Sequence, residues 1–275
     1  MLPVPMLPEL GRRTKPSRYY LFRASLASFP MSAGFRLKKA DPHAALPLRC
    51  RRSSVMDPLP IDERQLLLAD CESVKLDFGS VLCEPPMQVQ HVYFPDAGFI
   101  SLIKQLDNGS LIEIGMVGRE GIVGNDLNTT DDVATVTALA QGAGEACKIS
   151  LPVFRKHLSR SPAIRELVHH HSSYQLRQME QTIVCTRFHL IEQRLGRWLL
   201  MTADRAGSAT FAVTLEFLSY MLGIRRAGVT LAMGELRDRG LILYAAARWR
   251  SSTWTDWRRS LARATRWTLR LTATR

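Results

Sequence analysis

The sequence of 275 residues contains no long apolar segment. A transmembrane helix needs about 18 to 20 consecutive apolar residues, and no run of that length occurs. The best apolar stretch near the N-terminus is interrupted by Arg23, which argues against a secretory signal peptide. We therefore expect a cytoplasmic protein that has no membrane partner.

Cysteine is scarce and scattered along the chain. The five cysteines are Cys50, Cys71, Cys83, Cys147 and Cys185. No two of them have the CxxC spacing that is typical of a zinc site. An odd, dispersed set is typical of reduced cytosolic thiols rather than of a disulfide framework. The sequence therefore predicts neither a metal site nor a disulfide-stapled fold.

Acidic residues are scarce only at the two ends of the chain. Residues 1–55 hold eleven Lys/Arg and two acids, and residues 245–275 hold eight Arg and one acid, so their charges are +9 and +7. Residues 56–244 carry −4, and the formal charge of +12 therefore comes from the ends. For this reason net charge alone is weak support for a nucleic-acid partner.

Residues 1–55 show no sustained hydrophobic period. They are rich in proline and contain basic pairs such as Arg12-Arg13 and Arg51-Arg52. This composition predicts a disordered basic extension. Two other interpretations stay open. One is an organelle-targeting peptide, which is basic and poor in acids, and the other is a start site assigned too early, with Met56 near the natural start.

Between residues 56 and 160 the pattern is that of short strands. Short apolar runs alternate with turn residues, and glycine recurs from residue 79 to residue 124. Asp107-Asn108-Gly109 separates two such runs, and Asn-Gly favours a tight hairpin turn because it tolerates positive φ. Many short strands at regular intervals predict a β-sandwich or jelly roll. The predicted strands are 73–78, 91–94, 99–105, 111–116 and 135–140.

Helical periodicity replaces this pattern after residue 160. Pro162 stands where a helix can begin, because its missing N–H would have no partner there. Apolar residues recur at spacings of three and four across 161–187, which predicts one long helix that packs against a second copy of the chain. Residues 188–204 predict a second amphipathic helix. Its apolar side would hold Leu190, Leu195, Trp198, Leu199 and Ala203.

Three consecutive histidines, His169, His170 and His171, lie within the predicted long helix. Consecutive helical residues point about 100° apart, so the three rings cannot bind one metal ion together. We expect a solvated or dimer-facing patch rather than a metal or haem site.

The segment 214–242 has the spacing of a helix-turn-helix. Thr214 can cap a first helix, and Gly223 permits the left-handed turn that the motif needs. Arg225 and Arg226 then stand at the N-terminal end of a second helix, where a recognition helix meets base edges and phosphates. The residues expected to point inward are Leu218, Leu222, Val229 and Leu236. The alternative is a pair of core helices joined by a glycine turn.

These residues resemble the helix-turn-helix of the Crp/Fnr (cyclic-AMP receptor protein) family. The resemblance covers about residues 59–244, including the runs from His91 to Pro95 and from Glu113 to Gly124. It implies an α+β fold of three parts and a C-terminal winged helix. The parts are a cyclic-nucleotide-binding-type β-roll (jelly roll) sensor domain over 56–160, a dimerisation helix over 161–187 and a helix-turn-helix DNA-binding domain over 188–244.

The resemblance also implies partners and site residues. The recognition arginine of the family falls on Arg226, while Thr214 and Arg225 fall at phosphate contacts. We place Thr230 in the same DNA-binding set. Double-stranded DNA is the implied partner and a homodimer the implied state, and RNA polymerase is a further candidate partner.

The chain departs from the family in the ligand pocket. Members that bind cyclic AMP carry Gly-Glu where this chain has Gly124-Asn125, and Arg-Ser near its Thr135-Val136. An arginine pairs with the cyclic phosphate through charge-assisted hydrogen bonds, so the sequence argues against cyclic AMP. The lack of a cysteine cluster argues against an iron–sulfur cluster. The effector and any cofactor stay unknown.

The recognition helix and the tail depart as well. The family's glutamate after the arginine is Ala227 here, and a second base-contacting arginine falls on Leu231, so a different operator sequence is expected. Residues 245–275 have no glycine, although a wing normally contains one, and hold four of the five tryptophans. We expect the wing to be missing or degenerate. This atypical Arg/Trp-rich tail is either the product of a shifted reading frame or a nucleic-acid-binding tail.

The sequence thus predicts a dimeric, sequence-specific transcription regulator that senses its effector in the β-roll. The alternative is a cyclic-nucleotide-type sensor or scaffold whose DNA-binding half has decayed, which a missing wing would favour. An enzyme is the weakest interpretation, because no nucleophile elbow, phosphate loop or metal-ligand spacing occurs.

Overall fold

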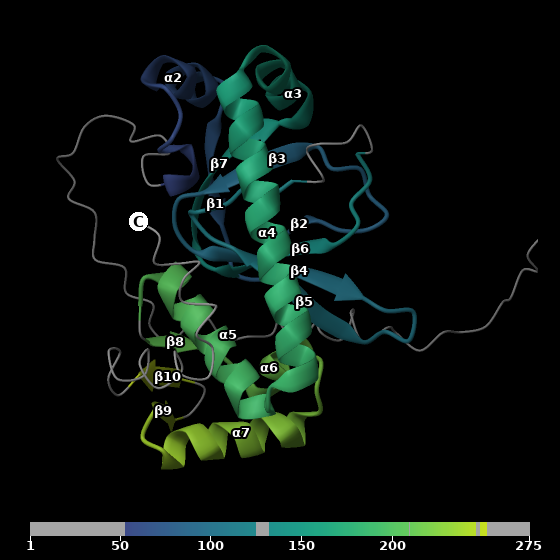
Figure 1. Cartoon of the computed structure of the whole chain (residues 1–275), viewed down its shortest axis with the longest axis vertical. Helices are drawn as coiled ribbons and strands as arrows, with labels where there is room; N and C mark the ends of the chain where they lie inside the picture. The colour runs from purple at the N-terminus through teal and green to yellow at the C-terminus, as the bar shows by residue number, and fades with distance from the viewer. Residues whose placement is uncertain (1–52, 125–131, 209, 246–247, 252–275) are drawn as a thin grey trace, which may run out of the picture.

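The computed structural model describes residues 53–124, 132–208, 210–245 and 248–251. Figure 1 shows the longest helix, α4 (Pro162–Phe188), running from the end that holds the β-roll to the end that holds the smaller helices α6 and α7. Within the described residues, no helix is long and apolar enough to cross a membrane.

The described chain begins with two short helices, η1 (Ser54–Met56) and α2 (Ile61–Ala69). Val55 and Met56 are buried, and the Val55 N–H donates to the carbonyl of Arg119 at 3.0 Å. The predicted extension therefore ends before residue 53 rather than at residue 55, because residues 53–55 belong to the folded part of the chain. Residues 1–52 lie outside the described residues.

Two antiparallel sheets form the β-roll. One has the order β1-β7-β3 and the other the order β2-β6-β4-β5. The hairpin predicted around Gly109 is confirmed, because β4 and β5 pair and Gly109 has φ 75°. Two strands, β2 and β7, were not expected from the sequence. The strands are β1 (Glu72–Leu76), β2 (Val81–Cys83), β3 (His91–Pro95), β4 (Phe99–Gln105), β5 (Leu111–Val117), β6 (Thr137–Gly142) and β7 (Gly144–Ser150).

Helix α3 (Leu151–Arg160) leads into α4, which begins at Pro162 as the sequence predicts. The Ser161 hydroxyl caps α4 by accepting from the Ile164 N–H at 2.9 Å. Gln178 then holds α4 to β5: its amide accepts from the Met116 N–H at 2.6 Å and donates to the Met116 carbonyl at 3.1 Å. A buried two-point contact thus fixes α4 against β5.

The histidine patch on α4 divides into two parts. His169 and His170 are exposed, whereas His171 is buried and its Nε2 accepts from the Ile122 N–H at 3.3 Å. The expectation of one solvated or dimer-facing patch is therefore wrong for His171, whose ring satisfies a backbone donor of the β-roll. Among the described residues, no group of His, Cys, Asp or Glu could hold a metal ion.

Helix α5 (Ile191–Ala206) follows a short break after α4. Leu195, Trp198, Leu199 and Ala203 are buried, which confirms most of its predicted apolar side. Leu190 is 65% exposed, so its assignment to that side is wrong. The reason is that Leu190 precedes the first turn of α5 as its N-cap and has extended backbone.

The C-terminal unit holds α6 (Leu215–Leu222), α7 (Arg226–Asp238) and a small sheet. The sheet has the order β8-β10-β9, with strands β8 (Thr210–Ala212), β9 (Ile242–Ala245) and β10 (Arg248–Ser251). Two antiparallel strands after the second helix form a wing. The expectation of a missing or degenerate wing is therefore wrong, because β10 pairs with both β9 and β8.

The sheet β2-β6-β4-β5 and the C-terminal helices share one core. Phe99, Ile103 and Met116 of the sheet belong to the same buried cluster as Leu195 of α5 and Leu218 of α6. Because interiors are close-packed, a shift on one side of this core is felt on the other.

The described cysteines differ in state. Cys71, Cys83 and Cys185 are free thiols, whereas Cys147 is disulfide-bonded. The expectation of reduced thiols throughout is therefore wrong at Cys147.

Candidate nucleic-acid interface

The first helix of the motif, α6, is capped as the sequence predicts. The Thr214 hydroxyl accepts from the Phe217 N–H at 3.1 Å. Leu218 and Leu222 are buried, so α6 is anchored on one face. The Thr214 hydroxyl proton remains available as a donor at the N-terminal end of α6, which is a favourable place for a phosphate.

The turn between the two helices depends on Gly223. Its φ of 63° and ψ of 37° lie in the left-handed region, which costs glycine nothing but costs an L-residue about 1–2 kcal/mol. The Ile224 N–H returns to the Ser219 carbonyl at 3.0 Å, which closes the end of α6. This turn directs the chain into α7 at the angle that the motif needs.

The second helix, α7, presents its arginines outward. Val229, Met233 and Leu236 on the opposite side are buried. Arg225 is the N-cap and Arg226 the first helical residue, and both are exposed. Within the described part of the chain, neither guanidinium forms an ion pair.

The N-terminal end of helix α7 is therefore positive and exposed, because it combines two guanidinium groups with the free N–H groups of the first turn. Thr230, also predicted as a site residue, is exposed one turn later, and its hydroxyl donates to the Arg226 carbonyl at 3.1 Å. The structure thus brings Arg225, Arg226 and Thr230 to one exposed helix edge.

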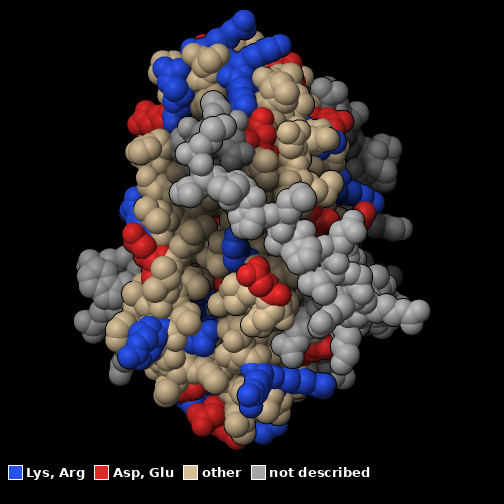
Figure 2. All heavy atoms as spheres, turned by 90° about the vertical axis from the view of Figure 1, so that its right-hand side faces the viewer, with Lys and Arg blue, Asp and Glu red and all other residues tan. Residues whose placement is uncertain are grey.

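Figure 2 views the molecule from the right-hand side of Figure 1. Lys and Arg side chains lie at its lower end, over the helix-turn-helix unit, together with acidic ones. One of the acidic residues of α7 is Asp238, which forms an ion pair with Arg237 at the C-terminal end of the helix. The interface is thus a local cationic edge rather than a uniformly basic face.

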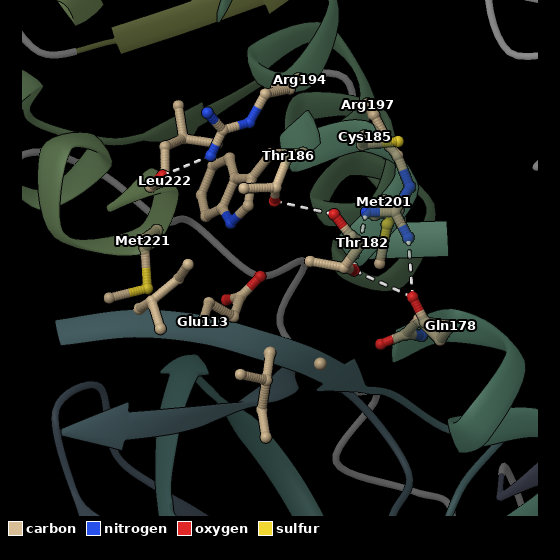
Figure 3. Close-up of a pocket in the computed structure, with 14 residues that line it drawn as sticks. Glu113, Gln178, Thr182, Cys185, Thr186, Arg194, Arg197, Met201, Met221 and Leu222 are labelled. Carbon is tan, nitrogen blue, oxygen red and sulfur yellow. Dashed lines mark hydrogen bonds between the residues drawn. The ribbon is translucent and has the colours of Figure 1, made fainter. Parts of the chain in front are cut away.

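A small pocket lies where β5, α4, α5 and α6 meet, as Figure 3 shows. Arg194 of α5 donates to the Leu222 carbonyl at 2.5 Å, at the end of α6. Arg197, one turn later, donates to the Thr182 hydroxyl at 3.2 Å and faces α4. Sequence reasoning did not find this junction. Its lining is Ile112, Glu113, Ile114, Gly115, Gln178, Thr182, Cys185, Thr186, Arg194, Arg197, Trp198, Met201, Met221 and Leu222.

Glu113 of β5 is the buried acid of this junction. Burial raises its pKa to about 7, against the opposite effects of the Ser101 hydroxyl, which donates to the carboxyl, and of Arg205 and Arg197. Burial also lowers the pKa of the Arg197 guanidinium. Ionisable groups therefore lie between the β-roll and the part that carries the helix-turn-helix.

A second link joins α5 to the β-roll. Arg205 near the end of α5 pairs with Glu120, with 2.8 Å between Nε and Oε1, and donates to the Tyr174 hydroxyl of α4 at 3.3 Å. The Arg205 side chain is almost fully buried. Losing one partner of such a pair would leave an uncompensated buried charge.

The positions compared with cyclic-AMP pockets are only partly described. Asn125 lies outside the described residues. Thr135 is exposed, and its carbonyl accepts from the Lys104 ammonium at 2.9 Å.

The Crp-like helix-turn-helix domain family matches residues 193–258. This match extends through β9 and β10, so the family pattern continues past Tyr244. No curated protein matches the chain significantly.

Solved structures of the Crp/Fnr family have the same fold. A putative transcriptional regulator of the crp/fnr family from Eubacterium rectale matches with a TM-score of 0.60 at 14% identity, covering 76% of this chain and 97% of that one. The c-di-GMP responsive global regulator CLP from Xanthomonas campestris matches with 0.60 at 17% identity, covering 70% and 99%. A CRP-family regulator from Thermus thermophilus matches with 0.57 at 18% identity, covering 69% and 96%.

A β-roll, a long helix and a Crp-like winged helix-turn-helix define a DNA-binding transcription regulator. The C-terminal part of the chain is thus similar to the Crp-like helix-turn-helix domain family, and the chain has the fold of a solved regulator of the crp/fnr family.

Proposed function

We propose that this regulator binds a palindromic duplex as a homodimer, with α7 of each subunit in the major groove. The observation that carries the proposal is the pair of exposed arginines, Arg225 and Arg226, at the N-terminal tip of a helix whose opposite face is buried. A recognition helix meets base edges with its N-terminal residues. The pair therefore stands where base and phosphate contacts form.

Each site residue has a separate role in this proposal. Arg226 donates to a guanine O6 and N7, the commonest specific contact in the major groove. Arg225 and the Thr214 hydroxyl bind phosphates and fix the register of the helix. Thr230 lies against the same groove, one helical turn from Arg226.

The dimer forms through α4. Leu176 and Ile183 are exposed and seven residues apart, which is one heptad on a helix surface. Val184 and Phe188 continue the exposed apolar stripe toward the end of α4. In a dimer, the stripes of two α4 helices would bury each other, in parallel or antiparallel orientation. In a monomer, this apolar surface would stay exposed to water.

We further propose that the β-roll binds an effector other than cyclic AMP. Thr135 occupies the place near which family members that bind cyclic AMP carry an arginine, and a threonine cannot supply the charge-assisted pair that a cyclic phosphate needs. Calorimetry with cyclic AMP should give no binding heat under conditions where a control regulator binds. We also propose a cytoplasmic location, with RNA polymerase as a further candidate partner.

The function is tested by selecting bound sequences from random DNA with the full chain. We expect a two-fold symmetric consensus whose half-sites are about 10 base pairs apart, centre to centre. Affinity should fall steeply with salt, because bound phosphates release counterions. Recovery of no consensus, with salt-insensitive binding, would overturn the proposal. The decayed-sensor alternative loses its main support, because the wing is present.

A further inference from the structure

One large apolar side chain stands exposed on the recognition helix. Leu231 is 73% exposed, although Ala232 and Met233 beside it in sequence are buried. The inner face of α7 is therefore complete without Leu231, whose side chain projects away from the core. A single exposed leucine is ordinary on a surface, so its position on the helix decides its meaning.

Leu231 lies on the exposed side of α7, about 140° around the helix axis from Arg226. It lies four residues after Ala227, which is also exposed, so the two side chains are neighbours on one face. It lies five residues after Arg226, or about 7.5 Å along the helix axis at 1.5 Å per residue. That distance corresponds to about two base pairs at 3.4 Å each.

The edge beyond Arg226 is chemically apolar. The Thr230 hydroxyl is engaged with the Arg226 carbonyl of its own helix, Ala227 offers a methyl group and Gly234 has no side chain. Residues 227–234 have no side chain with an amide or a charge to pair with polar base edges, and the next charged side chain, Glu235, lies one turn beyond Leu231. In the major groove only thymine presents a methyl group, at C5.

We propose that Leu231, supported by Ala227, is a specificity-determining residue that recognises a thymine through its C5-methyl group. The inference rests on the proposed DNA-binding function and deepens it. Each half-site then contains a guanine for Arg226 and, about two to three base pairs away, a thymine for Leu231. Polar base edges at that place are disfavoured, because an isobutyl group would displace water without replacing its hydrogen bonds.

The two exposed arginines of the same helix decide between possible occupants. A polyanionic duplex is the partner that accepts Arg225 and Arg226 together with the exposed Leu231 of α7. The flanking charge thus complements DNA while the apolar patch selects the base.

The test replaces single thymines by uracil in the selected operator, which removes only the C5-methyl group. For the full-length wild-type chain, one thymine in each half-site should be sensitive, and its replacement should weaken binding about three- to ten-fold, since one buried methyl group contributes about 0.8 kcal/mol or more. Replacing cytosine by 5-methylcytosine in a T-to-C variant of the same position should restore part of the loss.

Two variants complete the experiment. Leu231→Ala should bind the thymine operator as weakly as wild type binds the uracil operator, and it should no longer distinguish thymine from uracil. Leu66→Ala is the control, since Leu66 is 64% exposed on the remote helix α2. It should retain the full discrimination, and circular dichroism should give the same helical signal for all three proteins.

Three results would overturn the inference. First, every uracil-substituted operator could bind as tightly as the thymine operator while the consensus is still preferred over random DNA. That result would exclude the proposed role of Leu231 and leave the proposed function intact. Equal weakening of thymine and uracil complexes by Leu231→Ala would assign it a merely structural role. Absence of any consensus would remove both the inference and the proposed function.

Discussion

Two buried ionisable side chains, Glu113 and His171, have shifted pKa values. The two shifts make the free energy of unfolding depend on pH in opposite directions. Burial raises the pKa of Glu113 to about 7 and lowers the pKa of His171 to about 4. In both cases the neutral form is favoured, because charge is costly away from water. Both residues lie where the β-roll contacts the helices that follow it: Glu113 lines the pocket between β5, α5 and α6, and His171 of α4 contacts Ile122.

We predict that Glu113→Gln is more stable than wild type at pH 8. The folded protein retains the Glu113 proton up to about pH 7, whereas the unfolded chain releases it near 4.5. The free energy of unfolding therefore falls as the pH rises from about 4.5 through 7, by an amount of order 3 kcal/mol. Urea unfolding at a series of pH values from about 4.5 to 8 measures this fall, and the variant should lose the slope between about pH 4.5 and 7. Parallel curves for the two proteins would contradict it.

We predict the opposite slope for His171. Its pKa is lowered in the folded state, so the unfolded chain takes up a proton first as the pH falls below 6.5, and stability is lost between about pH 6.5 and 4. His171→Gln keeps an acceptor for the Ile122 N–H and removes the titration. The difference in unfolding free energy between wild type and variant should therefore shift in favour of the variant as the pH falls through this window. An unchanged difference would show that the ring is not buried neutral.

Sequence reasoning reached the exposed site residues more easily than these buried ones. The placement of Arg225 and Arg226 follows from their offsets after Gly223, because these offsets put both residues at the start of the second helix. Glu113 alternates correctly in a strand, but its neighbours Ser101 and Arg197 come from separate elements. A contact between distant segments leaves no local pattern, so the junction pocket could not be predicted.

At the scale of elements, long periodic segments were predicted and short paired ones were not. Helices α4 and α7 have several turns of regular spacing, so one misplaced residue does not hide them. Strands β2 and β8 have three residues each, which is too short for an alternation. The wing was missed for the same reason: β10 is defined by its pairing with β8 and β9 rather than by its own composition.

The turn of the helix-turn-helix gives a pair of glycine substitutions with opposite expected signs. Gly223→Ala should lower the free energy of unfolding by about 1–2 kcal/mol, because φ is +63° there. An added Cβ would also lie 3.2 Å from Ile112 Cδ1. Gly234→Ala, within α7 and with nothing within 4 Å of the added Cβ, should be neutral or raise stability by up to about 1 kcal/mol.

Thermal unfolding of the two variants beside wild type provides the measurement. The structure requires Gly223→Ala to melt below wild type and Gly234→Ala to melt at or above it. A Gly223→Ala protein as stable as wild type would mean that this residue does not adopt the left-handed turn.

At the scale of the whole molecule, one core joins the sheet β2-β6-β4-β5 to the helices of the helix-turn-helix unit. Leu111 of β5 and Leu222 of α6 belong to the same buried cluster, and Arg205 ties α5 to Glu120 of the β-roll. A ligand that moved the sheet would therefore act on the recognition helix through packed side chains. The shared core could not be predicted from the sequence, because its residues come from distant segments and meet only through tertiary packing.

The proposed dimer leads to a prediction about α4. Ile183→Glu should shift the chain from dimer to monomer in sedimentation, because Ile183 is 69% exposed on the apolar stripe and two carboxylates would face each other across the contact. Leu66→Glu on α2 is the control, and should leave the dimer intact. A dimer that persists in the Ile183→Glu variant would place the contact elsewhere.

The most direct measurement compares binding to the selected operator and to scrambled DNA for wild type, Arg226→Ala and Arg239→Ala. Both variants lose one exposed positive charge, but Arg239 lies at the opposite end of α7 from Arg226. We expect Arg226→Ala to lose about 1–3 kcal/mol of discrimination, and Arg239→Ala to retain it. If Arg226→Ala distinguishes operator from scrambled DNA as well as wild type does, the tip of α7 does not read the sequence.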